Sequence, residues 1–348
     1  MNKRYFYKMQ FSLICLLIFG AILLLAQNSW ATRLKIAVLA PQRTIWGRKM
    51  GVWAKDVKKK TAGKVKIKIY YGGIQGDEVK VVRLMKIGRL HGAGFMARGI
   101  SKVCPDSLVF AIPLMFHSED EAIWVQEKMQ DYLQQQARSR GYEILGWTRQ
   151  GFTYCFSQVK MDSIALLRQS KPWMLEKDAF CESFFRLNHI AAIPAPVGDV
   201  MVALQSGMIR TVFAPPIGML IMQWQSRVKY QLSTGLFYSF GAVVLNKKQW
   251  DKISQNNQAI IRKSFLKNNR ALNVAIKQQN ASALRVLHKK MTVLVPTPKN
   301  LQELYAVTEK VENEMNGKAF SRKSMELAKA YLKEYRAHQA GKNISKKN

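Results

Sequence analysis

The stretch Arg33–Tyr71, RLKIAVLAPQRTIWGRKMGVWAKDVKKKTAGKVKIKIYY, decides the fold class of this chain. Apolar residues alternate from Leu34 to Val38, as in a half-buried strand, and Pro41 ends the run. A helical pattern follows in Trp46–Val57, with apolar side chains every three or four residues, before period two returns in Lys64–Tyr71. The stretch therefore predicts a β-α-β unit. Because such crossovers join parallel strands, an α/β fold that opens with a parallel sheet is expected.

The same order continues beyond this unit. The turn Gly72–Asp77 leads into a second helical pattern, and Leu90–Phe95 reads as a third short strand. Open parallel sheets bind ligands beyond the carboxyl ends of their strands, which here are followed by Pro41–Trp46, Gly72–Asp77 and Gly94–Arg98. The glycine-rich turn has neither the GxGxxG nor the GK[ST] pattern. A small-molecule site without a nucleotide cofactor is therefore expected at this edge, and no other cofactor is indicated.

The rest of the chain contains more strands and one very long helix. Ser254–Lys290 has no Gly or Pro, which permits a helix of roughly 36 residues and ~54 Å, long enough to bridge two lobes. The remaining strand patterns are Leu108–Met115, Tyr142–Trp147, Phe152–Ser157, Lys171–Leu175, Ile209–Phe213 and Tyr238–Asn246.

The N-terminus predicts export. Basic residues lie among the first eight, Phe11–Ala26 is apolar apart from Ser12, and Ser29-Trp30-Ala31 places small residues where a signal peptidase requires them. We expect a signal peptide over residues 1–31, cleavage after Ala31 and a periplasmic protein. The alternative is an uncleaved anchor, since a run of roughly 16 apolar residues is only slightly shorter than the ~17 to 25 that span a bilayer.

Composition narrows the function classes. With 48% hydrophobic and 22% charged residues the chain is typical of a soluble globular protein, and its formal net charge is +33, or +30 without Lys3, Arg4 and Lys8. The cations are spread along the chain, and export argues against nucleic acid as a partner. Solubility and attraction to anionic envelope surfaces or anionic solutes are better explanations of the charge.

Catalytic and metal-binding patterns are not found in the sequence. The five histidines lie far apart, and GxSxG and HExxH are absent. Cys104, Cys155 and Cys181 have no close spacing, so small buried residues are expected in place of a metal or redox site. A non-enzymatic binding protein without cofactor or metal is the simplest interpretation.

Three segments together resemble a known family. They are GVWAKDVKKKTAGKVKIKIYYGGIQGDE (residues 51–78), LMKIGRLHGAGF (84–95) and VGDVMVALQSGMIRTVFAPPIGML (197–220). Their order and spacing resemble the solute-binding subunits of tripartite ATP-independent periplasmic (TRAP) transporters, DctP type, from about Thr32 to about Arg336. The resemblance implies a small-molecule organic ligand, delivery to TRAP membrane permease subunits and, as in some relatives with hydrophobic ligands, a periplasmic helical-repeat partner.

The resemblance also implies a domain organisation. Two α/β lobes are expected, joined by hinge strands and the long bridging helix. We assign residues 32–153 and 237–275 to lobe 1, residues 154–236 and 276–339 to lobe 2, and residues 340–348 to a disordered tail. Thr153 and Leu236 are the expected hinge positions. A ligand that contacts both lobes would stabilise only the closed state.

The chain departs from the family where the family holds a carboxylate. Trp173 stands at the position of the usual ligand-binding arginine, Thr153 at that of a second arginine, and Ala214 at that of a polar asparagine. An unpaired carboxylate in a closed cleft costs several kcal/mol, and tryptophan cannot pair it. A hydrophobic or amphipathic ligand is therefore expected. The other predicted ligand-binding aromatic residues are Trp46, Trp147, Phe152, Phe213 and Tyr238.

Alternatives remain open at this point. Arg149 could replace the missing arginine, which would return organic acids to the candidates, although a solvated surface arginine is the simpler interpretation. A cationic ligand could stack on tryptophan, but the positive net charge disfavours it. Finally, the fold could serve as a ligand-free envelope interaction protein, with its cleft filled by its own side chains.

Overall fold

The computed structural model describes residues 31–175 and 179–345. All but the last residue of the predicted signal peptide lies outside this part of the chain. No helix within it is both long and apolar enough to cross a membrane.

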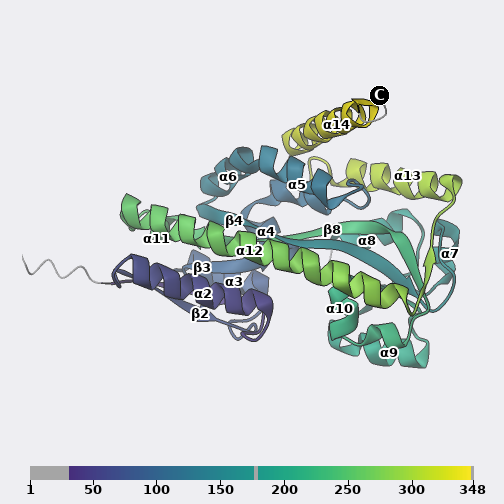
Figure 1. The fold of residues 1–348 in the computed structure, drawn as a ribbon, viewed down its shortest axis with the longest axis horizontal. Helices are drawn as coiled ribbons and strands as arrows, with labels where there is room; N and C mark the ends of the chain where they lie inside the picture. Colours follow the sequence, from purple (N-terminus) through teal and green to yellow (C-terminus); the bar gives the residue numbers. More distant parts are fainter. Residues whose placement is uncertain (1–30, 176–178, 346–348) are drawn as a thin grey trace, which may run out of the picture.

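The structure is a mixed α/β fold built on one large sheet (Figure 1). Strand order is β2-β1-β3-β8-β4-β7, with β9 on β8, and β5 pairs β6 separately. The strands are β1 (Thr32–Val38), β2 (Val65–Tyr70), β3 (Gly92–Met96), β4 (Tyr142–Ser157), β5 (Trp173–Leu175), β6 (Ile193–Ala195), β7 (Thr211–Ala214), β8 (Tyr230–Asn246) and β9 (Thr292–Leu294).

Helices cover the sheet and extend beyond its ends. The α-helices are α2 (Ile45–Lys60), α3 (Glu78–Lys86), α4 (Ala97–Val103), α5 (Glu119–Lys128), α6 (Gln130–Ser139), α7 (Ile164–Gln169), α8 (Ala179–Leu187), α9 (Val200–Ser206), α10 (Pro216–Ile221), α11 (Lys247–Trp250), α12 (Gln255–His288), α13 (Pro298–Met315) and α14 (Arg322–Ser345). Short 3-10 helices are η1 (Pro105–Ala111), η2 (Val197–Asp199) and η3 (Trp224–Ser226).

The first β-α-β unit forms as its sequence predicts. β1 pairs in parallel with both β2 and β3. Thr44 caps α2 by accepting a hydrogen bond from the Gly47 backbone N–H at 3.1 Å, as N-cap threonines do. Trp53 anchors α2, because its indole N–H donates to the Ile261 carbonyl of α12 at 3.2 Å. The predicted parallel opening of the sheet is confirmed.

Two long antiparallel strands, β4 and β8, run side by side through the middle of the molecule (Figure 1). The sequence predicts two strands, Tyr142–Trp147 and Phe152–Ser157, where the structure has the single strand β4. The residues between the two predicted strands stay paired with β8, because shifts in the register accommodate the extra residues there. Gly151, at one of these shifts, adopts φ +85°. Another shift places Thr153 opposite Phe237 and Tyr154 opposite Gly235, so Leu236 lies at a bulge beside Thr153.

The prediction of a strand at Leu108–Met115 is wrong. This apolar run is buried, but it forms the end of η1 and a turn. Long-range polar contacts fix the segment. Asp106 accepts from the Ser321 backbone N–H at 2.8 Å, and the Ser324 hydroxyl donates to the Asp106 carbonyl at 2.6 Å. A short apolar run cannot by itself distinguish these two outcomes.

The long helix α12 forms as predicted and lies along β4 (Figure 1). Its side chains bond to β4 carbonyls close to the register shifts. Arg262 donates to Ile144 O at 3.0 Å, Asn269 to Trp147 O at 2.7 Å and Asn280 to Gln150 O at 2.8 Å. Toward its two ends α12 contacts α2 and α10, so it connects parts of the molecule that lie toward opposite ends of the long strands.

The C-terminal helix α14 continues to Ser345, whereas a disordered tail is expected from residue 340. Upstream, Arg336 joins α14 to α5 through two hydrogen bonds to the Glu121 carboxylate, at 3.0 and 3.1 Å. Residues 346–348 lie outside the described part of the chain.

Candidate functional site

A cleft of about 490 Å³ lies over the paired strands β4 and β8. Residues at the end of β3 line it on one side, and residues of β5 line it on the other. Asp77 and Met96–Arg98 come from the predicted binding edge of the parallel sheet, while Pro41–Trp46 contributes nothing to the lining. The lining residues are Leu39, Asp77, Glu78, Met96, Ala97, Arg98, Ala111, Thr153, Trp173, Met174, Leu175, Phe180, Cys181, Phe185, Phe213, Phe237, Tyr238, Ser239 and Phe240.

Aromatic rings form one wall of this cleft. Phe213 of β7 packs between Phe185 of α8 and Phe237 of β8, with ring centroids 5.7 and 6.3 Å apart. Phe237 also meets Phe184 edge to face at 5.7 Å. Edge-to-face packing of this kind holds rings in fixed positions, so the wall is a preformed apolar surface.

Trp173 lies in the same wall, at the start of β5. Its indole N–H donates to the Ala195 carbonyl at 2.9 Å, and its ring packs edge to face against Trp224 at 5.5 Å. Trp173 is 6% exposed. Because its one polar group is already bonded, Trp173 offers the cleft only apolar surface.

Hydroxyl groups provide the polar part of the cleft on β4 and β8. The Thr153 and Ser239 hydroxyls lie 3.1 Å apart, on the paired strands β4 and β8. Both side chains are half-buried. They can offer a donor and an acceptor to a ligand but no charge.

Charge is confined to the end of the cleft formed by α3 and α4. Arg98 is the single cation among the described residues that line the cleft, and it lies 3.6 Å from Asp77. Glu78 is buried and accepts from the backbone N–H groups of Met96 and Gly99 at 2.6 and 2.7 Å. Burial raises the pKa of Glu78, although these hydrogen bonds oppose the increase. Arg98 belongs to the predicted segment Gly94–Arg98 but was not predicted as a site residue.

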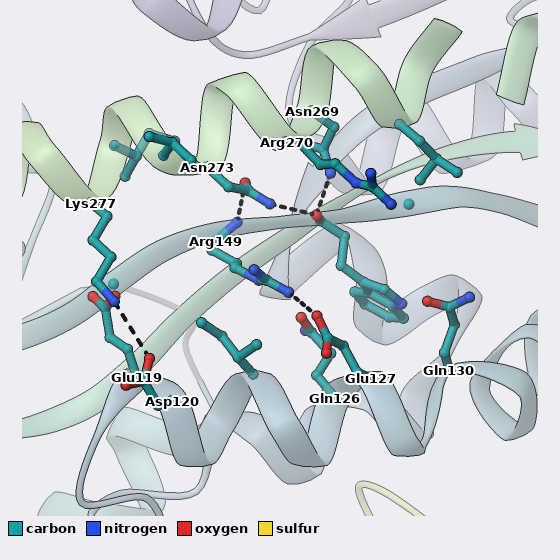
Figure 2. A pocket seen from close by; sticks show the side chains of 17 residues that line it. Glu119, Asp120, Gln126, Glu127, Gln130, Arg149, Asn269, Arg270, Asn273 and Lys277 are labelled. Carbon is teal, nitrogen blue, oxygen red and sulfur yellow. Dashed lines mark hydrogen bonds and ion pairs between the residues drawn. The ribbon is translucent and has the colours of Figure 1, made fainter. Parts of the chain in front are cut away.

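A second and larger pocket, of about 750 Å³, lies between α5, β4 and α12 (Figure 2). We call it the polar pocket. Arg149 points across it to Glu127 of α5, with Nη2 and Oε1 2.6 Å apart, and Lys277 of α12 lies 3.4 Å from Asp120. Among the described lining residues the two pockets share none, so Arg149 is not placed in the cleft.

Several polar atoms around the polar pocket have no hydrogen-bond partner among the residues that the structure describes. They are Arg149 Nε, Gln126 Nε2 and Asn269 Oδ1, and the last two residues are 2% and 7% exposed. Buried polar atoms without partners are costly, and water or a polar solute normally satisfies them. The polar pocket is therefore chemically unlike the cleft.

The other predicted site residues are distributed over both pockets and the core. Thr153, Trp173, Phe213 and Tyr238 line the cleft, and Trp147 and Arg149 line the polar pocket. The remaining three lie elsewhere in the structure, with Trp46 packed over Gly94 of β3, Phe152 against the Tyr238 ring at 5.8 Å, and Ala214 in the core with Trp224.

The acidic, histidine and cysteine side chains of residues 31–175 and 179–345 are the groups relevant to metal and thiol chemistry. No group of three or more His, Cys, Asp or Glu there is arranged to hold a metal ion. Burial raises the pKa of Cys104 to about 12 and also raises that of Cys155. Both side chains therefore stay protonated and behave as core residues.

Comparison with known proteins agrees with this geometry. Residues 36–318 match the model of the DctP family, described as bacterial extracellular solute-binding protein, family 7. The chain belongs to this family. A curated solute-binding protein of Verminephrobacter eiseniae is 23% identical over 230 residues, which is 65% of this chain and 68% of the relative.

Solved structures of TRAP periplasmic solute-binding proteins share the DctP fold of this chain. One from Ochrobactrum anthropi, with its C-terminus bound in the ligand-binding pocket, has TM-score 0.81 and 19% identity, covering 90% of this chain and 99% of that one. Another, from Desulfovibrio salexigens with bound orotic acid, has TM-score 0.74 and 20% identity, covering 88% and 99%. The two-lobed α/β architecture expected from the sequence is thereby confirmed.

The coarse function follows from the family. DctP proteins are extracytoplasmic solute-binding components of TRAP transporters, which bind small organic molecules and work with membrane permeases. Their family and fold are those of transport proteins rather than enzymes.

Proposed function

We propose that this DctP protein captures a hydrophobic or amphipathic organic molecule in the aromatic cleft and delivers it to the permease subunits of a TRAP transporter. The observation that carries the proposal is the wall of Trp173, Phe213 and Phe237, which presents rings where a carboxylate would require a cation. A cleft of about 490 Å³ is within the range of small-molecule sites and argues against one filled by its own side chains.

The distribution of charge favours an amphipathic ligand with its polar end toward α4. Arg98 can pair an acidic head group, while the aromatic wall takes the apolar body. The Desulfovibrio salexigens protein holds orotic acid, so organic acids are compatible with the fold. In this chain Arg98 is shared with Asp77, which weakens its hold on a small, fully charged acid.

The closure of the cleft would occur at the bulge beside Thr153 and Leu236, where the pairing of β4 and β8 changes register. The proposed lobes, residues 32–153 with 237–275 and residues 154–236 with 276–339, meet there. A ligand that contacts both sides stabilises the closed state by its difference in affinity for the two states. A helical-repeat partner stays a prediction based on the resemblance alone.

The test is native mass spectrometry of the exported protein, followed by organic extraction of whatever co-purifies. We expect an apolar or amphipathic molecule that is retained by the wild type and lost in Trp173→Ala. Trp250→Ala is the matched control, since Trp250 is 5% exposed but lies away from the cleft. A tightly bound small dicarboxylate that survives Trp173→Ala would contradict the proposal.

A second candidate is an organic acid held by Arg149 in the polar pocket. The unpartnered buried atoms of Arg149, Gln126 and Asn269 favour it, because they could bond to a polar solute. Loss of the co-purifying molecule in Arg149→Gln, with retention in Trp173→Ala, would support this second candidate over the first.

A further inference from the structure

Four cations lie together on one face of the first two strands. The parallel register places Arg33 directly opposite Lys66 and Lys35 directly opposite Lys68. All four side chains are exposed. We call Arg33, Lys35, Lys66 and Lys68 the cationic strand face. The sequence shows these residues only as parts of separate basic runs, and the pairing of β1 with β2 brings them together.

The pleat of the sheet explains why these side chains share a face. Leu34, Ile36 and Val65 are buried in the core that α2 covers, together with Trp53. Since successive side chains of a strand point to opposite faces, the intervening cations point away from α2. The cationic strand face is thus the side of β1 and β2 that α2 leaves uncovered.

Acidic residues do not neutralise this face. Between Thr32 and Gly76 the sequence has twelve Lys or Arg residues and one acid, Asp56. That carboxylate belongs to α2, where it accepts hydrogen bonds from Lys60 at 2.7 Å and Ser264 at 2.6 Å. In the part of the chain that the structure describes, none of the four cations forms an ion pair within 4.0 Å.

Folding alone does not account for the arrangement. Like charges directly opposite each other destabilise a sheet. Lysines on an edge strand can prevent pairing with other chains, and β2 is an edge strand. β1, however, is an inner strand, with β2 along one side and β3 pairing with Ile36–Val38 on the other. Lys35 lies next to this pairing, because its carbonyl accepts a hydrogen bond from the His91 backbone N–H at 2.8 Å. Protection of the edge strand β2 therefore accounts for Lys66 and Lys68 but not for Lys35.

We propose that the cationic strand face binds the anionic surface of a phospholipid bilayer. Lysine-rich surfaces attract anionic lipid head groups without a shaped pocket, which suits an exposed sheet face. The net charge, +33 for the full chain and +30 without Lys3, Arg4 and Lys8, acts in the same direction over longer range. The apolar run of the predicted signal peptide, Phe11–Ala26, ends a few residues before β1 in the sequence, so export through this peptide would bring β1 out beside the membrane.

The test is co-sedimentation of the exported protein with vesicles. Phosphatidylcholine vesicles containing phosphatidylglycerol are compared with vesicles of phosphatidylcholine alone, at low and high salt. The variant is Lys35→Gln/Lys66→Gln/Lys68→Gln. Each lysine close to an anionic surface contributes about fivefold, so the partition coefficient should fall on the order of 100-fold in the variant. Wild-type binding should weaken in high salt and be negligible on the neutral vesicles.

The matched control is Lys299→Gln/Lys310→Gln/Lys323→Gln. It removes the same charge from exposed positions of α13 and α14, which lie on the other side of the molecule from β2 (Figure 1). An equal loss of binding in this control would overturn the proposal in favour of net charge alone. Unchanged vesicle binding of the strand-face variant, accompanied by new aggregation, would overturn it and assign the lysines to edge protection. Ligand retention in the cleft is measured on the same samples and should be unaffected.

Discussion

Arg149 Nη2 lies 2.6 Å from Glu127 Oε1, and this pair belongs to the polar pocket rather than to the aromatic cleft. We predict that Arg149→Gln leaves the affinity for the cleft ligand unchanged. The two side chains are partly exposed, so the variant should lose less than about 1 kcal/mol of stability. Calorimetric titration with the co-purified molecule and urea unfolding would measure the two effects. A large loss of affinity would show that the polar pocket holds the ligand.

The position of Arg149 shows where sequence reasoning about the site reaches its limit. Side chains alternate along β4, but the register shift between Arg149 and Gly151 adds a residue to the strand. One extra residue reverses which face every later side chain meets. Counting along the sequence therefore could not place Arg149 relative to Thr153, although both lie on the same strand.

The fold was more predictable than the site, because its decisive signals are local. The periodicity of β1, α2 and β2 and the Gly-free, Pro-free run of α12 depend only on neighbouring residues. The single strand β4 and the helical turn at η1 depend on distant partners, such as Asn280 on Gln150 and Ser321 on Asp106. Trp173, Thr153 and Phe213 were placed in one region through the resemblance to the family, and they do line one cleft.

Trp46 is expected to stabilise the fold rather than bind ligand. Its ring lies so close to Gly94 of β3 that a Cβ added there would overlap it. Gly94→Ala should therefore destabilise the protein by about 1–3 kcal/mol through overpacking, with ligand affinity unchanged. The control Gly198→Ala adds a Cβ that meets no heavy atom of the described residues within 4 Å, apart from Gly198 itself and its chain neighbours. Thermal unfolding of both variants tests the prediction, and equal stabilities would contradict it.

His91 should make stability depend on pH. Burial lowers its pKa from 6.5, and Lys35 and Lys252 lower it further, against a backbone hydrogen bond that raises it. The unfolded chain therefore takes up the proton first as pH falls. Neutral His91 makes its full contribution to the free energy of unfolding above about pH 6.5, the pKa of histidine in the unfolded chain. This contribution decreases as the pH falls from that value toward the lower pKa of His91 in the folded protein.

We predict that His91→Gln reduces this acid sensitivity. The free energy of unfolding, measured with urea at a series of pH values from neutral to mildly acidic, should fall less steeply in the variant than in the wild type. His288→Gln removes an exposed histidine at the end of α12 and serves as the matched control. Parallel curves for His91→Gln and the wild type would show that another group is responsible.

The Glu143 carboxylate, which is fully buried in β4, joins three elements of the fold. Arg138 of α6 donates to it at 2.8 and 3.0 Å, and Arg262 of α12 donates to its Oε1. Removing the acid deletes these charge-assisted hydrogen bonds and leaves Arg138 and Arg262, which are 51% and 33% exposed, to be solvated by water. We therefore predict that Glu143→Ala costs about 1–3 kcal/mol of unfolding free energy.

A surface ion pair provides the comparison for Glu143→Ala. Glu334→Ala removes the partner of Lys128, whose side chain is largely exposed, and should cost less than about 1 kcal/mol. Urea unfolding of both variants gives the difference. Because Arg262 ties α12 to β4 beside a register shift, Glu143→Ala should also increase amide hydrogen exchange along the first turns of α12. Similar costs for the two variants would mean that water replaces the carboxylate, and that the long helix is held on the sheet chiefly by its apolar contacts and its asparagines.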